Sequence, residues 1–322
     1  MIRRLVFIEK EYLCGCFYTP NTHGMTDICC IGHITLDKII TPQHTSYMPG
    51  GTAYYFSRGM ASLHAQTGYK LITALSSKEY PVVDELRKAG IDVDVLPSRH
   101  TVYFENRYEE NSDNRTQRVL AKADPFTIDS LHKENARFFH LGSLLADDFP
   151  TEVIEYLSGK AVLSVDAQGY LREVKGDKVS PADWPEKQEV LKYIDILKVN
   201  EHEAEVLTGY ADPKHAAEQL SAWGVKEVLL TLGSLGSIIL ADGICYKIPA
   251  YPPRQTIDAT GCGDTYVMGY LYMRNKGVSY PDAGCFAAAL STLKLEKSGP
   301  LTATAEEAYR VIDANRSKVE IL

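Results

Sequence analysis

The chain has 322 residues, of which 45% are hydrophobic and 24% charged, and this composition is typical of a globular protein with a sizeable core. Its formal net charge of −8 argues against a surface that binds nucleic acid or anionic membranes. No apolar run approaches the length needed to cross a membrane. Because the net charge is negative, the charge of an anionic substrate must be neutralised within its binding site by backbone amides, a few basic residues and a metal.

The seven cysteines predict reduced thiols in a cytoplasmic protein. Their number is odd, and no CxxC pair stands with a second CxxC or an HxxxH, so the sequence predicts neither a disulfide framework nor a zinc site.

Residues 1–24 differ from the rest of the chain. Charged residues 9–11 interrupt the apolar start too soon for a secretory signal, and the first clear strand pattern follows Met25. We expect residues 1–24 to be an extension outside the fold, and residues 25–322 to form one domain.

The first half alternates strand and helix patterns. Residues 27–32 form a short apolar run that ends at Gly32, as expected of a buried parallel strand. Asp37 follows this strand, and ligands of open α/β sheets bind beyond the carboxyl ends of strands. Gly50 and Gly51 either let a ligand approach the backbone or make the turn before a helix. Further elements are expected as strands over 70–75 and 91–95, and as helices over 54–66 and 80–89.

Two segments interrupt this alternation and predict a small β lid. Residues 101–108 and 115–120 are β-like runs on either side of a polar turn at 109–114, which is the pattern of a hairpin. Residues 38–48 are also polar and β-like. We expect lid segments at about 38–48 and 98–124.

The second half returns to alternating strands and helices, which predicts an α/β fold with a mainly parallel central sheet and helices on both faces. Residues 173–187 are expected to be a polar loop. Strands are expected over 137–141, 161–166, 194–200, 227–233 and 236–241, and helices over 151–158, 201–207, 214–223, 265–276, 282–295 and 305–314.

The stretch at 258–264, with the sequence DATGCGD, is the strongest chemical signal. Gly261 and Gly263 precede a helix, so backbone N–H groups converge where the helix dipole is positive, which favours an anion. Asp264 is then placed to take a proton from a nucleophile. The alternative is a tight turn with Asp264 as a helix cap. Cys262 is either a thiol activated by the helix end or a small residue filling the turn.

Two weaker signals follow neighbouring strands. Asn200 and Glu203 have the spacing of a helix-capping pair, and the same oxygens suit Mg²⁺, directly or through water. Thr231, Gly233 and Gly236 form a turn that either lines phosphates or only reverses the chain.

Together these motifs resemble the ribokinase-like (PfkB) family of carbohydrate kinases over about residues 26–315. The matching segments are DATGCGD at 258–264, NEHE at 200–203, TLGSLG at 231–236, Gly50-Gly51, and Asp37. Cys262 stands where alanine is usual, and residues 52–55 lack the asparagine that often follows the glycine pair. The segments at 104–118 and 166–172 resemble a branch that holds less characterised sugar, inositol and nucleoside kinases.

The resemblance implies a role for each matching position. Asp264 would be the base, and Gly261, Cys262 and Gly263 would stabilise the transferred phosphoryl group. Asn200, Glu203 and the turn at 231–236 would bind ATP, with Glu203 holding Mg²⁺ through water. Some members bind a monovalent cation near the segment that Asp258 opens, which makes Asp258 a candidate ligand.

The resemblance leaves the acceptor open. The expected acceptor is a small polyhydroxylated compound, a sugar or polyol with inositol among the candidates, contacted by Asp37, Gly50, Gly51 and Arg107. A nucleoside kinase of the same fold and a catalytically silent sugar- or nucleotide-sensing protein are the alternatives. Lid strands of the family often mediate dimerisation, so the resemblance makes a homodimer through the lid a candidate assembly, and neither nucleic acid nor membrane is an expected partner.

Overall fold

The computed structural model describes residues 25–63, 67–108, 115–315 and 318–322. The expected extension at 1–24 and the lid turn at 109–114 lie outside these residues, as does the end of the helix expected over 54–66. Among the described residues, no helix is long and apolar enough to cross a membrane.

The main sheet confirms the predicted α/β class. In the described part of the chain it has ten strands in the order β16-β15-β14-β13-β12-β9-β8-β1-β4-β5. The pairings from β13 to β5 are parallel, and those from β13 to β16 are antiparallel. The strands are β1 (Thr26–Gly32), β4 (Tyr69–Leu75), β5 (Asp92–Pro97), β8 (Ala136–Gly142), β9 (Val162–Asp166), β12 (Ile196–Asn200), β13 (Glu227–Thr231), β14 (Ser237–Ala241), β15 (Ile244–Ile248) and β16 (Glu320–Ile321).

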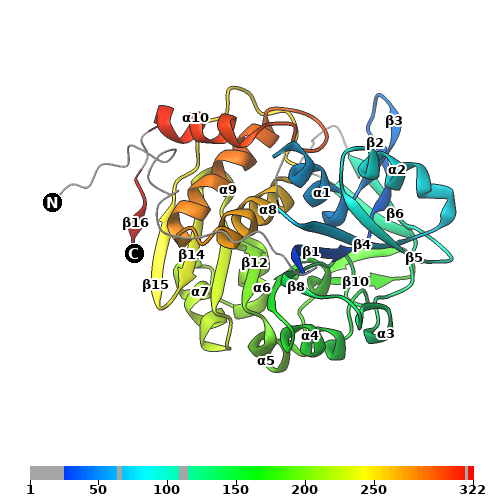
Figure 1. Cartoon of the computed structure of the whole chain (residues 1–322), viewed down its shortest axis with the longest axis horizontal. Helices are drawn as coiled ribbons and strands as arrows, with labels where there is room; N and C mark the ends of the chain where they lie inside the picture. Colours follow the sequence, from blue (N-terminus) through cyan, green and yellow to red (C-terminus); the bar gives the residue numbers. More distant parts are fainter. Residues whose placement is uncertain (1–24, 64–66, 109–114, 316–317) are drawn as a thin grey trace.

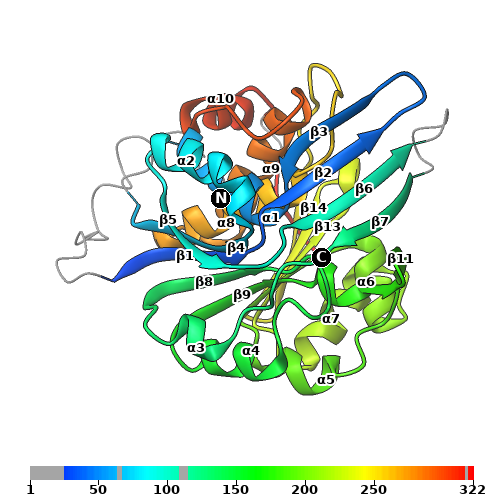
Figure 2. The same cartoon turned by 90° about the vertical axis from the view of Figure 1, so that its right-hand side faces the viewer.

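Helices cover both faces of this sheet (Figures 1 and 2). One face carries α1 (Thr52–Ser62), α2 (Tyr80–Lys88), α8 (Cys262–Asn275), α9 (Tyr280–Leu295) and α10 (Ala305–Asn315). The other carries α3 (Ile128–Leu131), α4 (Thr151–Ser158), α5 (Lys187–Val190), α6 (Glu201–Thr208) and α7 (Pro213–Ala222). Short 3₁₀ helices are η1 (Ser77–Glu79), η2 (Ala167–Leu171), η3 (Leu191–Tyr193) and η4 (Gly233–Leu235).

Strand β1 separates two hydrophobic cores. Because side chains alternate along a strand, Cys30 packs into the core that includes Phe56 and Tyr270, whereas Cys29 packs into the core that includes Phe139 and Leu163. Both cysteines are at most 1% exposed. β1 is therefore buried on both faces, as its continuous apolar run predicted.

A second, smaller sheet extends beyond the main one and forms the lid. Its strand order is β10-β11-β7-β6-β2-β3, with β10 (Arg172–Lys175), β11 (Lys178–Pro181), β7 (Arg115–Ala121), β6 (Val102–Tyr108), β2 (Thr35–Ile40) and β3 (Thr45–Gly50). The expectation of a polar loop over 173–187 is therefore wrong for residues 173–181. Val174 and Val179 face each other across the β10–β11 pair and pack on the lid's apolar cluster.

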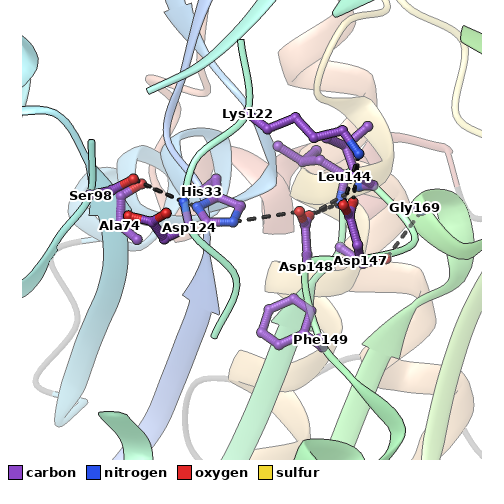
Figure 3. Close-up of polar contacts among 12 residues, drawn as sticks. His33, Ala74, Ser98, Lys122, Asp124, Leu144, Asp147, Asp148, Phe149 and Gly169 are labelled. Atoms are coloured by element: carbon purple, nitrogen blue, oxygen red, sulfur yellow. Dashed lines mark hydrogen bonds and ion pairs between the residues drawn. The ribbon is translucent and has the colours of Figure 1, made fainter. Parts of the chain in front are cut away.

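The chain crosses between the two sheets beside a buried histidine (Figure 3). His33 follows β1, and its Nδ1 lies 3.1 Å from the carbonyl oxygen of Ala74 at β4. Its Nε2 lies 3.5 Å from Oδ1 of Asp148, whose Oδ2 accepts hydrogen bonds from the backbone N–H groups of Leu144 and Leu145. These contacts join the ends of three core strands where the lid begins.

Candidate active site

Polar side chains gather at one edge of the main sheet, and two of them, Asn200 and Thr231, were predicted from sequence as site residues. Asp166, Asn200 and Thr231 end the adjacent parallel strands β9, β12 and β13. The carboxyl ends of parallel strands form the usual ligand-binding edge of such sheets.

Helix α8 begins at Cys262, earlier than the Thr265 expected from sequence, and Gly261 is its N-cap with φ of 79°. A side chain at Gly261 would also collide with the ring of Tyr55, because an added Cβ would lie 2.3 Å from that ring. Glycine is required here for both its backbone conformation and its lack of a side chain. The Cys262 N–H donates to the Ala259 carbonyl oxygen at 3.1 Å, whereas the N–H groups of Gly263 and Asp264 lie in the first turn, where a helix offers its donors to an anion.

Asp264 lies in this first turn and is not the helix cap. The N-cap residue is Gly261, and no side chain forms a capping hydrogen bond there. Its carboxylate accepts a hydrogen bond from the Thr52 side chain at the start of α1. Burial and the negative charge of Asp166 raise the pKa of Asp264 to about 6, although Lys198 and Thr52 partly offset them. A carboxylate of this kind is a better proton acceptor near neutral pH than an ordinary aspartate.

Lys198, on β12, is a buried ammonium that the sequence analysis did not single out. Its Nζ lies 3.1 Å from Oδ2 of Asp166 and 3.8 Å from Oε2 of Glu203. Burial alone would lower the pKa of Lys198, but Asp166, Glu203 and Asp264 raise it above its ordinary value, so the side chain stays charged. A Cβ at Gly263 would lie only 3.1 Å from this Nζ. The ammonium thus lies next to Gly263, in the turn that the sequence predicted to bind an anion.

Asn200 and Glu203 form a reciprocal capping pair at the start of α6. The Asn200 N–H donates to Oε2 of Glu203 at 2.7 Å, and the Glu203 N–H donates to Oδ1 of Asn200 at 2.9 Å. Burial raises the pKa of Glu203, partly offset by Lys198. Both residues also line a cavity of about 390 Å³, which is bounded on its other side by residues of β7, β11 and η2. The capping role and a place in the ligand cavity are therefore compatible.

The turn after β13 presents bare backbone. Gly233 and Gly236 have φ of 55° and 93°, and nothing lies within 4 Å of a Cβ built at Gly233. Gly236 packs tightly instead, because its Cβ would lie 2.1 Å from the carbonyl oxygen of Ile248. Leu235, beside this turn, is 73% exposed. The hydroxyl of the half-buried Thr231 donates to the Val199 carbonyl oxygen at 3.4 Å.

Asp37 belongs to the inner face of the lid. It accepts a hydrogen bond of 2.7 Å from the Thr35 hydroxyl, and a Cβ at Gly50 would lie 2.3 Å from its Oδ2. Gly51, with φ of 85°, caps α1 and packs against the His33 carbonyl oxygen. Burial and the charges of Asp258, Asp264 and Asp37 raise the pKa of Tyr55. Tyr55 therefore stays neutral, and its ring lies against Gly261 at the start of α8.

Arg107 is not brought to this inner face. It lies 4.0 Å from Glu105, which pairs with Lys38, and these side chains share the outer face of the lid. Asn106, next to Arg107 in β6, shares the inner face with Asp37 and accepts a hydrogen bond from Gln117. Strand alternation separates neighbouring residues in this way.

The expected homodimer through the lid stays a prediction.

Asp258, expected as a candidate cation ligand, already has hydrogen-bond partners within the protein. Its Oδ1 accepts a hydrogen bond from the Thr260 N–H, and Lys294 donates to its carbonyl oxygen at 2.8 Å. Cys262 is not an activated thiol, because burial raises its pKa to about 11 despite the nearby charge of Lys294.

The site suits a magnesium ion carried by a phosphate ligand. No cluster of three or more metal-binding side chains occurs in the described ranges. Mg²⁺ bound with substrate phosphates typically takes one or two protein carboxylates, and its other ligands are phosphate oxygens and waters. The carboxylate of Glu203, which lines the cavity, can be such a ligand.

Local sequence spacing could not have found every member of the site. Lys198 lies in β12, Asp166 in β9, and Thr52 and Tyr55 in α1, and no motif links these three elements. One signal was available for Lys198, since a lysine inside an apolar strand is unusual.

The mainly parallel sheet, the second smaller sheet and the helix that begins at a glycine turn by the sheet's carboxyl edge define the ribokinase-like fold. The chain belongs to the pfkB family of carbohydrate kinases, whose family model matches residues 25–307.

Individual relatives differ in substrate. A pyrophosphate-dependent kinase of the ribokinase family, solved with a pyrophosphate analogue and myo-inositol, is 31% identical, with a TM-score of 0.78 over 88% of this chain and 99% of that one. The cytidine kinase of Thermococcus kodakarensis is 28% identical over 263 residues, 79% of this chain and 90% of that protein. Arabidopsis thaliana ribokinase, solved with ribose and ATP, shares the fold with a TM-score of 0.73 at 20% identity, over 89% of this chain and 99% of that one.

Proposed function

We propose that this kinase transfers the γ-phosphoryl group of ATP to one hydroxyl of a small sugar or cyclic polyol, with myo-inositol as the first acceptor to test. The observation that carries the proposal is Asp264, a carboxylate of raised pKa in the first turn of α8, where amide groups face an incoming anion.

In this mechanism the acceptor lies between the inner face of the lid and α8. Asp264 removes the proton of the acceptor hydroxyl as its oxygen attacks the γ-phosphorus, and the bond from that phosphorus to the ADP oxygen breaks. The N–H groups around Gly263 and the Lys198 ammonium behind them stabilise the charge of the transferred group. Mg²⁺, held through Glu203, would neutralise the phosphate chain.

The acceptor side supports a polyhydroxylated ligand. Asp37, Asn106 and Gln117 lie on the inner face of the lid and offer hydrogen-bonding groups. The relative solved with myo-inositol is also the most similar of the structures described above, which favours a cyclic polyol over a linear one.

The phosphoryl donor, ATP or pyrophosphate, needs a separate argument, because that same relative is pyrophosphate-dependent. We favour ATP for this chain because the exposed Leu235 and the bare backbone at Gly233 offer an apolar surface for a purine base. Pyrophosphate has no base and needs no such surface. Lys198 is already paired with Asp166 and Glu203, so a compact, highly charged donor would find this cation partly neutralised.

A nucleoside kinase is the second candidate, favoured by the similarity to a cytidine kinase over most of both chains. Its acceptor would have to fit a base as well as a ribose between the lid and α8.

The test is a matrix of two donors, Mg·ATP and Mg·pyrophosphate, against myo-inositol, ribose and cytidine, with products identified by ³¹P NMR. We expect a phosphorylated product from ATP and myo-inositol. Asp264→Asn should lower its rate by about 10²–10⁴-fold. If pyrophosphate but not ATP yields product, the assignment of ATP as donor is rejected. If cytidine is the one acceptor phosphorylated, the nucleoside kinase is favoured. Full activity of Asp264→Asn would reject Asp264 as the general base.

A further inference from the structure

Lys294, near the end of α9, is a second buried ammonium, and its side chain is 0% exposed. Its Nζ donates to the Asp258 carbonyl oxygen at 2.8 Å and to the Lys297 carbonyl oxygen at 3.3 Å. It also lies 3.4 Å from Oδ2 of Asp258. An ammonium has three N–H donors, and here three oxygens surround it.

This oxygen cage has the chemistry of a monovalent-cation site. Backbone carbonyl oxygens that converge on one point replace the hydration shell of an ion such as K⁺. The adjacent Asp258 carboxylate supplies the balancing negative charge. Burial would raise the pKa of Asp258, but hydrogen bonds from Thr260 and the charge of Lys294 hold it below its ordinary value.

The cage lies where the anion-binding turn joins the rest of the protein. The N–H of Ile257 donates to the Leu295 carbonyl oxygen at 2.9 Å, and the N–H of Gly299 lies 3.3 Å from Oδ2 of Asp258. The Ser291 hydroxyl donates to the Cys262 carbonyl oxygen at 3.1 Å. Lys294 thus holds the segment leading to Gly261 against the end of α9.

A bound monovalent cation, which the family resemblance suggested at Asp258, does not fit these residues because the Lys294 ammonium already fills the cage. We propose that Lys294 is a built-in replacement for that cation, which positions the anion-binding turn and makes the kinase independent of K⁺ and Na⁺. The activity part of this inference rests on the proposed function.

The first test compares wild-type activity in KCl, NaCl and tetramethylammonium chloride at equal ionic strength. We expect equal rates in all three salts. A rate that depends on K⁺ or Na⁺ would overturn the proposal, because the cage would then lack a resident cation.

The second test removes the ammonium. Lys294→Ala should lower the rate by about 10²-fold in tetramethylammonium chloride, as expected when a reacting group is misplaced by about 1 Å. KCl or NH₄Cl should recover most of this loss, because a small cation can enter the vacated space. Lys294→Met fills that space with an uncharged chain and should stay slow in every salt. Lys297→Ala removes only an exposed side chain of the same segment and keeps the backbone carbonyl oxygen that contacts Lys294, so it should behave as the wild type.

A third measurement does not depend on catalysis. The melting temperature of Lys294→Ala should rise in KCl relative to tetramethylammonium chloride, whereas those of the wild type and Lys294→Met should not. If Lys294→Ala shows neither recovered activity nor this thermal shift, Lys294 is only a structural ion pair and the proposal is wrong. If no acceptor is phosphorylated, the proposed function fails, but the thermal shift still decides whether the cage is a cation site.

Discussion

Asp264 shows how one residue acquires its chemistry from its surroundings. Burial and Asp166 favour its protonated form and prevail over Lys198 and the Thr52 hydrogen bond, which favour the charged form. The resulting pKa of about 6 lies close to neutral pH, where a general base is most effective.

This pKa gives a prediction for activity. Because only the ionised carboxylate accepts a proton, kcat/KM should rise with pH, with its midpoint near the pKa of about 6, and level off above it. Initial rates between pH 4.5 and 8.5 would measure it, with buffers chosen around the pKa. A flat profile across that midpoint would contradict the role of Asp264 as base.

The same shift has the opposite sign for stability. The pKa of Asp264 is raised from 3.8 in the unfolded chain, so the folded state binds this proton more tightly. Its contribution to stability is present below pH 3.8 and is lost as the pH rises through about 6. Asp264→Asn removes this dependence, and at neutral pH it should raise the melting temperature while it lowers activity.

At this scale, the sequence predicted residues that belong to local motifs and missed residues that meet only after folding. Gly261, Gly263 and Asp264 share one turn, and their spacing was informative. Lys198 and Lys294 reach the site from β12 and α9, and nothing in their local sequence indicates which carboxylates and carbonyl groups they will meet.

The β10–β11 hairpin is the element that sequence analysis missed. Half of its strand residues are charged and each strand has only four residues, so the period-two pattern is too short to recognise. Val174 and Val179 become apolar partners only when the hairpin joins the lid. The hairpin meets β7 through a single register pair, Lys178 with Arg118, reinforced by the bond between the Val119 N–H and the Asp177 carbonyl oxygen.

We predict that Val179→Ala loosens this hairpin locally. It removes part of the small apolar contact that holds a short edge pair to the lid, and such marginal elements open before the core. Hydrogen exchange of residues 172–181 should become faster, while exchange in β1 stays unchanged. Lys175→Ala, at an exposed position of the same hairpin, is the matched control. Equal exchange in both variants would show that the valine contact does not hold the hairpin.

At the scale of the whole molecule, the two sheets are joined through the buried contacts of His33 and Asp148. The sequence predicted the main sheet well because its strands are continuous apolar runs, and it predicted the lid hairpin from alternation. The junction could not be predicted, because His33 and Asp148 are far apart in the chain. β15 was also missed, since Ile244–Ile248 is a short antiparallel strand without a helix after it.

We predict that Asp148→Ala destabilises the protein by about 3–5 kcal/mol, because it leaves two buried N–H groups and His33 without their carboxylate. Urea denaturation followed by circular dichroism would measure this change. Asp147→Ala removes a neighbouring carboxylate that pairs with Lys122 at the surface, and it should change stability by less than about 0.5 kcal/mol. Similar losses in both variants would contradict a special role for the junction.

The adjacent cysteines of β1, Cys29 and Cys30, can serve as chemical probes of the opening of the two cores. Cys29 faces one core and Cys30 the other, and burial raises the pKa of both thiols, so neither reacts while its layer is closed. In variants that keep one of the two, the rate of alkylation would time the opening of each layer separately. Equal rates would mean that both layers melt as one cooperative unit, and unequal rates would identify the layer that opens first.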